Sequence, residues 1–222
     1  MKSPVFYMVK LWVSPEECKR YVDWLDGKHI REVIRQPGFL WARRCRLEGP
    51  DEKGFIGHFL IFGVDSLDSL RRYLDSPGSG HSLEESKKFK DVRIERLYGT
   101  LDLELASPGR SGNEEPKILF CSRTWVSPEG HKGYFGWLDG GHLAEVISMQ
   151  GFLWLQRVHL DGRDENGWER YINIYGQTSL ETVKEFLTNP AGERFAREAA
   201  PYAKDVRRET FFGVVELALN SK

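Results

Sequence analysis

Two histidines are the first candidates for chemistry in this chain of 222 residues. His29 and His142 are each followed three positions later by a glutamate, Glu32 and Glu145 respectively. On a helix these positions share a side, so the carboxylate could raise the pKa of the imidazole toward neutral pH and orient the ring. The pattern therefore predicts a general acid or base. The alternative is a structural histidine that caps a helix kink. We expect no metal, because no clear third ligand accompanies the pair.

A second candidate is a strand whose polarity differs between the two halves of the chain. Its alternating positions, which point to one face of a strand, are His58, Leu60 and Phe62 in the first half and Tyr171, Asn173 and Tyr175 in the second. Buried polar groups need partners, so the second half is predicted to hold a pocket whose wall hydrogen-bonds a substrate. The alternative is a partly solvated face.

Two arginines occupy matching positions on the preceding strand. Arg44 and Arg157 stand on a half-apolar face, where a guanidinium could hold a substrate carboxylate or an enolate oxygen. Pairing with a helix carboxylate, Asp139 or Glu145 in the second half, is the structural alternative.

Trp24 and Trp137 belong to a set of tryptophans that both halves keep. An aromatic wall for a planar substrate is one interpretation, and core packing is the other. The set comprises Trp12, Trp24, Trp41, Trp125, Trp137 and Trp154.

The elements that must position these residues come in two copies. Residues 12–41 return at 125–154 with a constant offset of 113, and 19 of the 30 positions are identical. Two copies of one domain are therefore predicted, at 1–105 and 117–222. The Pro-, Gly- and Ser-rich stretch 106–116 is the expected linker.

Each copy has the pattern β-α-β-β-α-β, which is ferredoxin-like. Ser14-Pro15 and Ser127-Pro128 mark helix starts, and Asp26-Gly27 predicts a break or kink. Two such sheets, packed face to face, predict an α+β barrel with helices outside. In the first copy we expect strands at 5–13, 38–48, 55–63 and 92–105, a second helix from Ser66 and a charged continuation of that helix at 82–90.

The amino-acid composition limits the kinds of partner that we expect this protein to bind. Net charge is −1, from 32 basic and 33 acidic residues, so nucleic acid is not expected as a partner. No apolar run approaches the roughly 18 residues that span a bilayer, so no membrane association is expected. The three cysteines, Cys18, Cys45 and Cys121, are unmatched between the copies and predict reduced thiols in the cytoplasm.

The run Trp24-Leu-Asp-Gly-Lys-His29-Ile-Arg-Glu32-Val, followed by Pro37-Gly38-Phe39-Leu and Arg43-Arg44, resembles the EthD-like branch of the dimeric α+β barrel superfamily. The stretch from Leu187 through Pro190 and Arg194 to Ala199 resembles that branch's second helix. Usual members pair two chains, so the resemblance implies a tandem fusion, a monomer containing its own pseudo-dimer. Further homo-oligomerisation stays open.

The resemblance implies a small-molecule enzyme. Members include monooxygenases, cyclases, isomerases, dehydratases and haem enzymes, and a shared fold does not fix the reaction. We expect cofactor-free acid–base chemistry on a hydrophobic or aromatic molecule, with His142 as proton carrier and the first copy either a second site around His29 and His58 or a structural partner. A non-catalytic binding protein and a haem site are the alternatives.

Overall fold

The computed structural model describes residues 3–221, except for the side chains of 80–83. The chain forms two compact units by its contacts. Unit 1 consists of the residues up to Thr100 together with those from Gly213 onward, and unit 2 consists of Leu101–Phe212. The last part of each copy's final strand thus belongs to the unit built mainly by the other copy. The boundaries at 105 and 117 come from the sequence repeat and stay a prediction.

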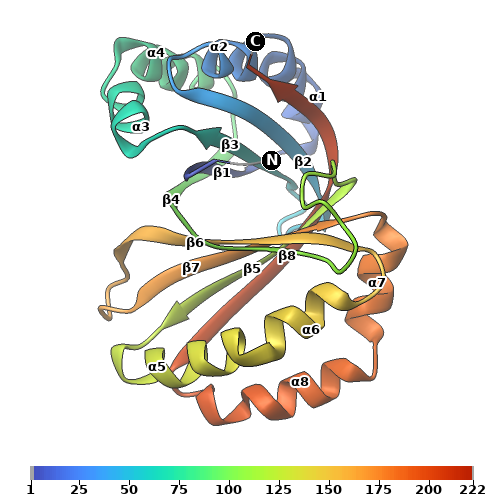
Figure 1. Ribbon diagram of the computed structural model, residues 1–222. Helices are drawn as coiled ribbons and strands as arrows, with labels where there is room; N and C mark the ends of the chain where they lie inside the picture. Colours follow the sequence, from blue (N-terminus) through green and yellow to red (C-terminus); the bar gives the residue numbers. More distant parts are fainter. Residues whose placement is uncertain (1–2, 222) are drawn as a thin grey trace. The chain divides into compact units, whose positions relative to one another are not determined.

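Unit 1 places its helices on one face of its strands (Figure 1). Its elements are β1 (Val5–Val13), α1 (Pro15–Trp24), the π-helical turn η1 (Leu25–His29), α2 (Ile30–Ile34), β2 (Phe39–Pro50), β3 (Ile56–Val64), α3 (Leu67–Leu74), α4 (Pro77–Ser86) and the first part of β4 (Val92–Ala106).

Unit 2 repeats this order, again with helices on one face of its strands (Figure 1). Its elements are β5 (Ile118–Val126), α5 (Pro128–Trp137), the π-helical turn η2 (Leu138–His142), α6 (Leu143–Ser148), β6 (Phe152–Arg163), β7 (Glu169–Gln177), α7 (Leu180–Thr188), α8 (Ala191–Ala199), the 3₁₀ turn η3 (Ala200–Tyr202) and the first part of β8 (Val206–Asn220).

The eight strands hydrogen-bond in the order β1-β3-β2-β8-β5-β7-β6-β4, which closes into a barrel. In unit 1, β1 and β3 are antiparallel with Tyr7 opposite Phe62, and the end of β8 pairs with β2 so that Arg44 faces Leu217. The corresponding register in unit 2 sets Phe120 opposite Tyr175. The predicted α+β class with two β-α-β-β-α-β units is confirmed.

The structure differs from the expected elements at two points. The break or kink predicted at Asp26-Gly27 is a π-helical turn. In unit 1 this turn joins the flanking helices, whereas in unit 2 Gly141, with φ of 146°, leaves helical backbone and makes the turn a kink between two helices. The continuation of the second helix spans Pro77–Ser86, where 82–90 was expected. Residues 87–90 instead form a turn and bend before β4.

The core of each unit lies between helices and sheet. Strand residues of odd number in β1, such as Tyr7 and Leu11, pack there against Tyr21, Leu25 and residues of α2 and α3. Unit 2 has the matching cluster around Phe120, Tyr134, Leu138 and Tyr175. Within the described residues, no helix is long and apolar enough to cross a membrane.

Candidate functional site

The π-helical turns stack each candidate histidine on a tryptophan. A π-helix bonds residue i to residue i+5, and Trp24–His29 and Trp137–His142 have this spacing. The ring centroids of Trp24 and His29 are 4.8 Å apart with an interplanar angle of 14°. Those of Trp137 and His142 are 4.1 Å apart at 26°. Trp24 and Trp137 therefore act as platforms for the imidazoles.

Burial keeps both imidazoles neutral. It lowers the pKa of His29 to about 4, with a further lowering from the Arg96 cation. Burial likewise lowers the pKa of His142 to about 4. The Nδ1 atom of each ring is buried and has no hydrogen-bond partner among the described residues.

The expected rise of these pKa values is not observed, because burial outweighs the carboxylates. Glu145 favours the charged form of His142, but its carboxylate is paired with Arg194. Glu32 lies in α2, where its backbone oxygen accepts a hydrogen bond from Gln36. The predicted histidine and glutamate therefore share a helical segment, while the pKa shift comes from the protein interior.

His29 lines a cavity of about 40 Å³ between the helices and strands of unit 1. The described lining of the cavity contains one cation, Arg96, which lowers the pKa of Tyr7 against the larger effect of burial. Tyr21 and Tyr73 add two more phenols. Burial raises the pKa of Tyr7 and Tyr73, and that of Tyr21 to about 12, so all three remain protonated near neutral pH. A neutral imidazole, a cation and three hydroxyl groups thus meet in an aromatic cavity.

Unit 2 assembles a similar set of groups from different positions. Burial raises the pKa of Tyr175, which is also influenced by Tyr134 and Arg208, and Arg208 also acts on His142. The cross-strand pair Tyr7–Phe62 of unit 1 corresponds to Phe120–Tyr175 in unit 2, with the phenol moved to the opposite strand. Both units therefore keep a buried histidine, an arginine and buried phenols.

The polar third strand of the second copy is buried. Tyr171, Asn173 and Tyr175 are only 5%, 4% and 5% exposed, so the alternative of a solvated face is wrong. Both tyrosines belong to the hydrophobic core of unit 2, where Tyr175 packs on Phe120 and Tyr171 packs on Phe135. The Oδ1 atom of Asn173 is buried without a hydrogen-bond partner in the described part of the chain.

Tyr171 is held by three residues that the sequence did not place in the site. Its hydroxyl donates to Glu169 Oε2 at 2.9 Å and lies 3.1 Å from His131 Nε2. His159 stacks on the Tyr171 ring at 4.5 Å and 13°. Burial and Glu169 raise the pKa of Tyr171. The signal was present in the repeat, because His131 and His159 replace Cys18 and Arg46 of the first copy.

Arg157 and Arg44 are buried and each is engaged by two carboxylates. Arg157 bonds Asp139 on η2 at 2.6 and 3.1 Å and Asp102 at 2.5 Å. Burial disfavours its charge, but the two carboxylates outweigh that effect and raise the pKa of Arg157. This pairing is the structural alternative foreseen for Arg157, which ties the π-helical turn to the strand.

Arg44 repeats this arrangement in unit 1. Its guanidinium bonds Asp26 on η1 through two contacts of 2.7 Å and Glu216 through one of 2.7 Å. Its pKa is also raised by these partners, against the effect of burial.

His58 hydrogen-bonds Arg44 and faces Cys18. Arg44 Nη1 lies 3.2 Å from Nδ1, and Cys18 Sγ lies 3.7 Å from Nε2. A guanidinium can only donate, so Nδ1 accepts and the proton of the neutral ring sits on Nε2. Burial and Arg44 lower the pKa of His58 to about 4, and burial raises that of Cys18. This tautomer cannot remove the Cys18 proton, so the pair is not a nucleophilic dyad.

Comparison with solved structures identifies the fold of this chain. Residues 4–95 match a family described as a domain of unknown function (DUF4286). No curated protein matches the sequence. Three solved structures are similar over nearly the whole chain, at low identity.

An anthrone oxidase-like protein is 15% identical, with a TM-score of 0.70 and coverage of 99% of this chain and 94% of that one. A candidate monooxygenase from Lactobacillus acidophilus NCFM is 11% identical, with a TM-score of 0.62 and coverage of 99% and 97%. A chlorite dismutase variant from Candidatus Nitrospira defluvii is 10% identical, with a TM-score of 0.57 and coverage of 98% and 92%. The chain has the dimeric α+β barrel fold. Among the side chains that the structure describes, no group of three or more His, Cys, Asp or Glu residues is arranged to hold a metal ion.

Proposed function

We propose that this protein is an enzyme that moves protons on a small hydrophobic molecule, aromatic or polyketide-like, using only its own side chains. One observation carries the proposal. The Nδ1 atom of His29 is buried without a hydrogen-bond partner within the described residues, and His29 lines a cavity that also holds Arg96 and three phenols. A buried polar atom without a partner is uncommon and is typical of sites that act on a ligand.

The chemistry begins with a carbon acid next to a carbonyl group. Neutral His29 takes the C–H proton at Nδ1, and the C–H electron pair moves onto the carbonyl oxygen to form an enolate. Arg96 and the hydroxyl of Tyr7 stabilise the new negative charge. Return of the proton to another carbon completes an isomerisation. Cyclisation, dehydration and oxygenation of such substrates begin with the same step.

A ligand with a ring must widen the cavity, because small-molecule sites usually measure about 300–1,000 Å³. One contact that holds α4 over this region is a lysine–glutamate pair, in which Lys28 Nζ donates to both oxygens of Glu85 at 2.8 and 2.9 Å. The site does not fit a haem, since His29 lies flat on Trp24 and the cavity of about 40 Å³ is far smaller than the macrocycle.

Proton transfer can be tested without knowing the natural substrate. Anthrone and 2-indanone have acidic methylene protons that exchange with deuterium in heavy water, and proton NMR follows the loss of their signals. We expect the protein to accelerate exchange over buffer. The variant His29→Gln should lose about 10²–10⁴-fold of that rate, the usual effect of a general base. His159→Gln removes an exposed histidine of unit 2 and is the matched control.

A binding protein without chemistry is the alternative, favoured by the buried aromatic lining of the cavity. It predicts that these ketones raise the melting temperature by mass action and exchange no faster than in buffer. Exchange that is equally fast in His29→Gln and wild type would remove His29 from the reaction.

A further inference from the structure

A groove of about 590 Å³ on unit 1 leads into the His29 cavity. The groove and the cavity share three lining residues, Ser86, Ile94 and Arg96. Phe89 forms part of the groove wall, and its ring lies 4.9 Å from that of Tyr21, which lines the cavity. The groove therefore adjoins the cavity of His29.

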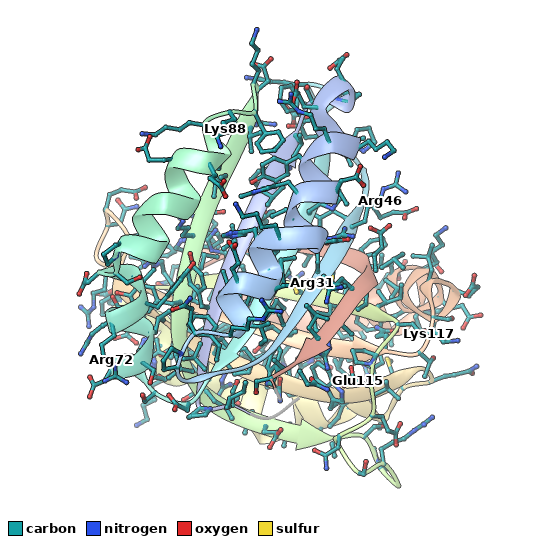
Figure 2. The ribbon with its side chains drawn as sticks, turned by 90° about the horizontal axis from the view of Figure 1, so that it is seen from above. Arg31, Arg46, Arg72, Lys88, Glu115 and Lys117 are labelled. Carbon is teal, nitrogen blue, oxygen red and sulfur yellow. The ribbon has the colours of Figure 1, made fainter. Side chains whose placement is uncertain are left out.

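The groove is positively charged although the whole chain is nearly neutral. Its ten lining residues include one carboxylate, Asp91, and four cations, Lys53, Lys87, Arg93 and Arg96. Lys88, which follows α4 near the start of β4 (Figure 2), is a further cation next to Lys87 in the chain and forms an ion pair with Glu85 at 3.5 Å. With a net charge of −1 for the chain, this local excess creates a field that attracts anions.

Comparison with unit 2 shows which cations of the groove also occur in the other unit and which do not. The run Val92-Arg93 and Gly99 return as Val206-Arg207 and Gly213. Arg93 pairs with Asp51 as Arg207 pairs with Asp164, so that ion pair is common to both units.

The remaining cations are peculiar to unit 1. Thr210 takes the place of Arg96, and Asn166 takes the place of Lys53. Lys87 forms an ion pair with Glu84, but both side chains are more than 60% exposed, so water weakens that pair. Lys53, Lys87 and Arg96 are thus the cations that a ligand can use.

Aromatic rings lie beside these cations. The guanidinium of Arg93 is 4.7 Å from the centroid of Phe55, and that of Arg20 is 4.8 Å from the centroid of Phe89. Both rings are only partly buried. A site with flat apolar faces and adjacent cations suits a ligand with a hydrophobic body and an anionic group.

We infer that the substrate is a hydrophobic acid, held by its anionic group in the groove near Lys53 and Lys87 while its carbon-acid part reaches His29. The anion is a carboxylate, phosphate or sulfate. The description of this ligand as a substrate rests on the proposed function, but its recognition as an anion does not.

Binding of matched probes tests the inference directly. The probes are 2-naphthoate, 2-naphthyl phosphate and the neutral isostere 2-naphthamide, titrated by calorimetry at low and high salt. We expect at least one anion to bind tenfold or more tightly than the amide, with a preference that shrinks as salt screens the charges. In the double variant Lys53→Asn, Lys87→Gln the preference should fall to less than threefold.

The control variant Lys132→Asn, Lys184→Gln removes the same charge from exposed positions of unit 2 and should keep the preference. Equal affinity for the amide and both anions, or a preference that survives the groove variant, overturns the inference, as does a failure of both anions to bind at millimolar concentration. Selective anion binding together with no deuterium exchange in the ketone assay would leave the inference standing and overturn the proposed function. The relative affinities of naphthoate and naphthyl phosphate identify the preferred anion.

Discussion

Asp102 accepts a 2.5 Å hydrogen bond from Nε of Arg157, although the two residues lie 55 positions apart and the repeat assigns them to different copies. Glu216 does the same for Arg44 at 2.7 Å. By the offset that aligns Gly99 with Gly213, Asp102 and Glu216 occupy equivalent positions. Each copy therefore supplies one carboxylate to the buried arginine of the unit that the other copy mainly builds.

These exchanged carboxylates should matter for stability. We expect Asp102→Asn and Glu216→Gln each to lower the free energy of unfolding by roughly 1–3 kcal/mol, the usual range for hydrogen bonds to charged groups. Each arginine keeps its partner on the π-helical turn, which limits the loss. Urea unfolding measures the effect, and Asp23→Asn is the control, because the Lys19–Asp23 pair is exposed and should contribute little to stability. Equal effects of all three variants would contradict a structural role for the exchange.

Stability should fall in mild acid. His29, His58 and His142 have folded pKa values of about 4, below the unfolded value of 6.5, so the unfolded chain binds more protons between these two pH values. The stabilisation from neutral imidazoles is complete above pH 6.5 and is lost as pH falls toward 4. For His29 the loss is about 3 kcal/mol at most. Urea unfolding from pH 7.5 to 4.5 should show this slope, and His29→Gln should reduce it. The same slope in wild type and variant would show that His29 is not the buried neutral group.

The pH dependence of proton transfer should follow the same imidazole. If His29 acts as the base, the deuterium-exchange rate should rise with pH around 4 and be flat near neutrality, because His29 is already neutral there. The measurement is the exchange rate per protein molecule between pH 3.5 and 8, corrected for buffer. A rate that rises through pH 6.5 would show that His29 is not the base.

Opening of the cavity should depend on Glu85. Its carboxylate, whose pKa is lowered to about 2 mainly by the hydrogen bond from Lys28, joins α4 to the π-helical turn η1. Glu85→Gln should speed hydrogen exchange of the amides in 77–86 and raise the association rate of ring-containing ligands. Glu84→Gln removes the exposed neighbouring partner of Lys87 and should leave both quantities near wild type. If both variants behave alike, α4 does not control access.

The tyrosine hydroxyl lies on different strands in the two units, and moving it in unit 1 tests whether its position matters for activity. Tyr7→Phe with Phe62→Tyr moves the hydroxyl to the strand that carries it in unit 2, where Phe120 faces Tyr175. Because the pair keeps its volume, we expect a change in unfolding free energy below about 1.5 kcal/mol. Proton-transfer activity should exceed that of Tyr7→Phe alone. If the double variant is no more active than Tyr7→Phe, activity requires the hydroxyl on the strand that carries Tyr7.

The sequence predicted the architecture because its evidence was local and duplicated. The Ser-Pro helix starts, the alternating strands and the repeat of 12–41 at 125–154 each specify elements with little ambiguity. The π-helical turn itself could not be predicted, because Asp26-Gly27 indicates only a break or kink. The stacking of His29 on Trp24 depends on how the turn packs. Burial also reversed the expected pKa shift, and burial depends on tertiary structure.

The sequence placed the polar pocket mainly in the second copy, because only the third strand of each copy was compared. Tyr175 in place of Phe62 suggested that only the second copy had gained polarity. The neighbouring strand compensates, with Tyr7 in the first copy and Phe120 in the second. Cross-strand register, which the sequence does not give, is needed to see that both units keep a phenol at this pair.

The exchange of strand ends also has a consequence for synthesis. The residues of unit 1 up to Thr100 are made before those of unit 2, yet the sheet of unit 1 requires the pairing of β2 with residues from Gly213 onward. Until those residues emerge, β2 has an open edge, the kind of strand that invites pairing with another chain. Domains generally fold in order as they are translated. Here the half that is made first is completed last, so a ribosome that stalls before codon 213 releases a protein with an unfinished N-terminal unit.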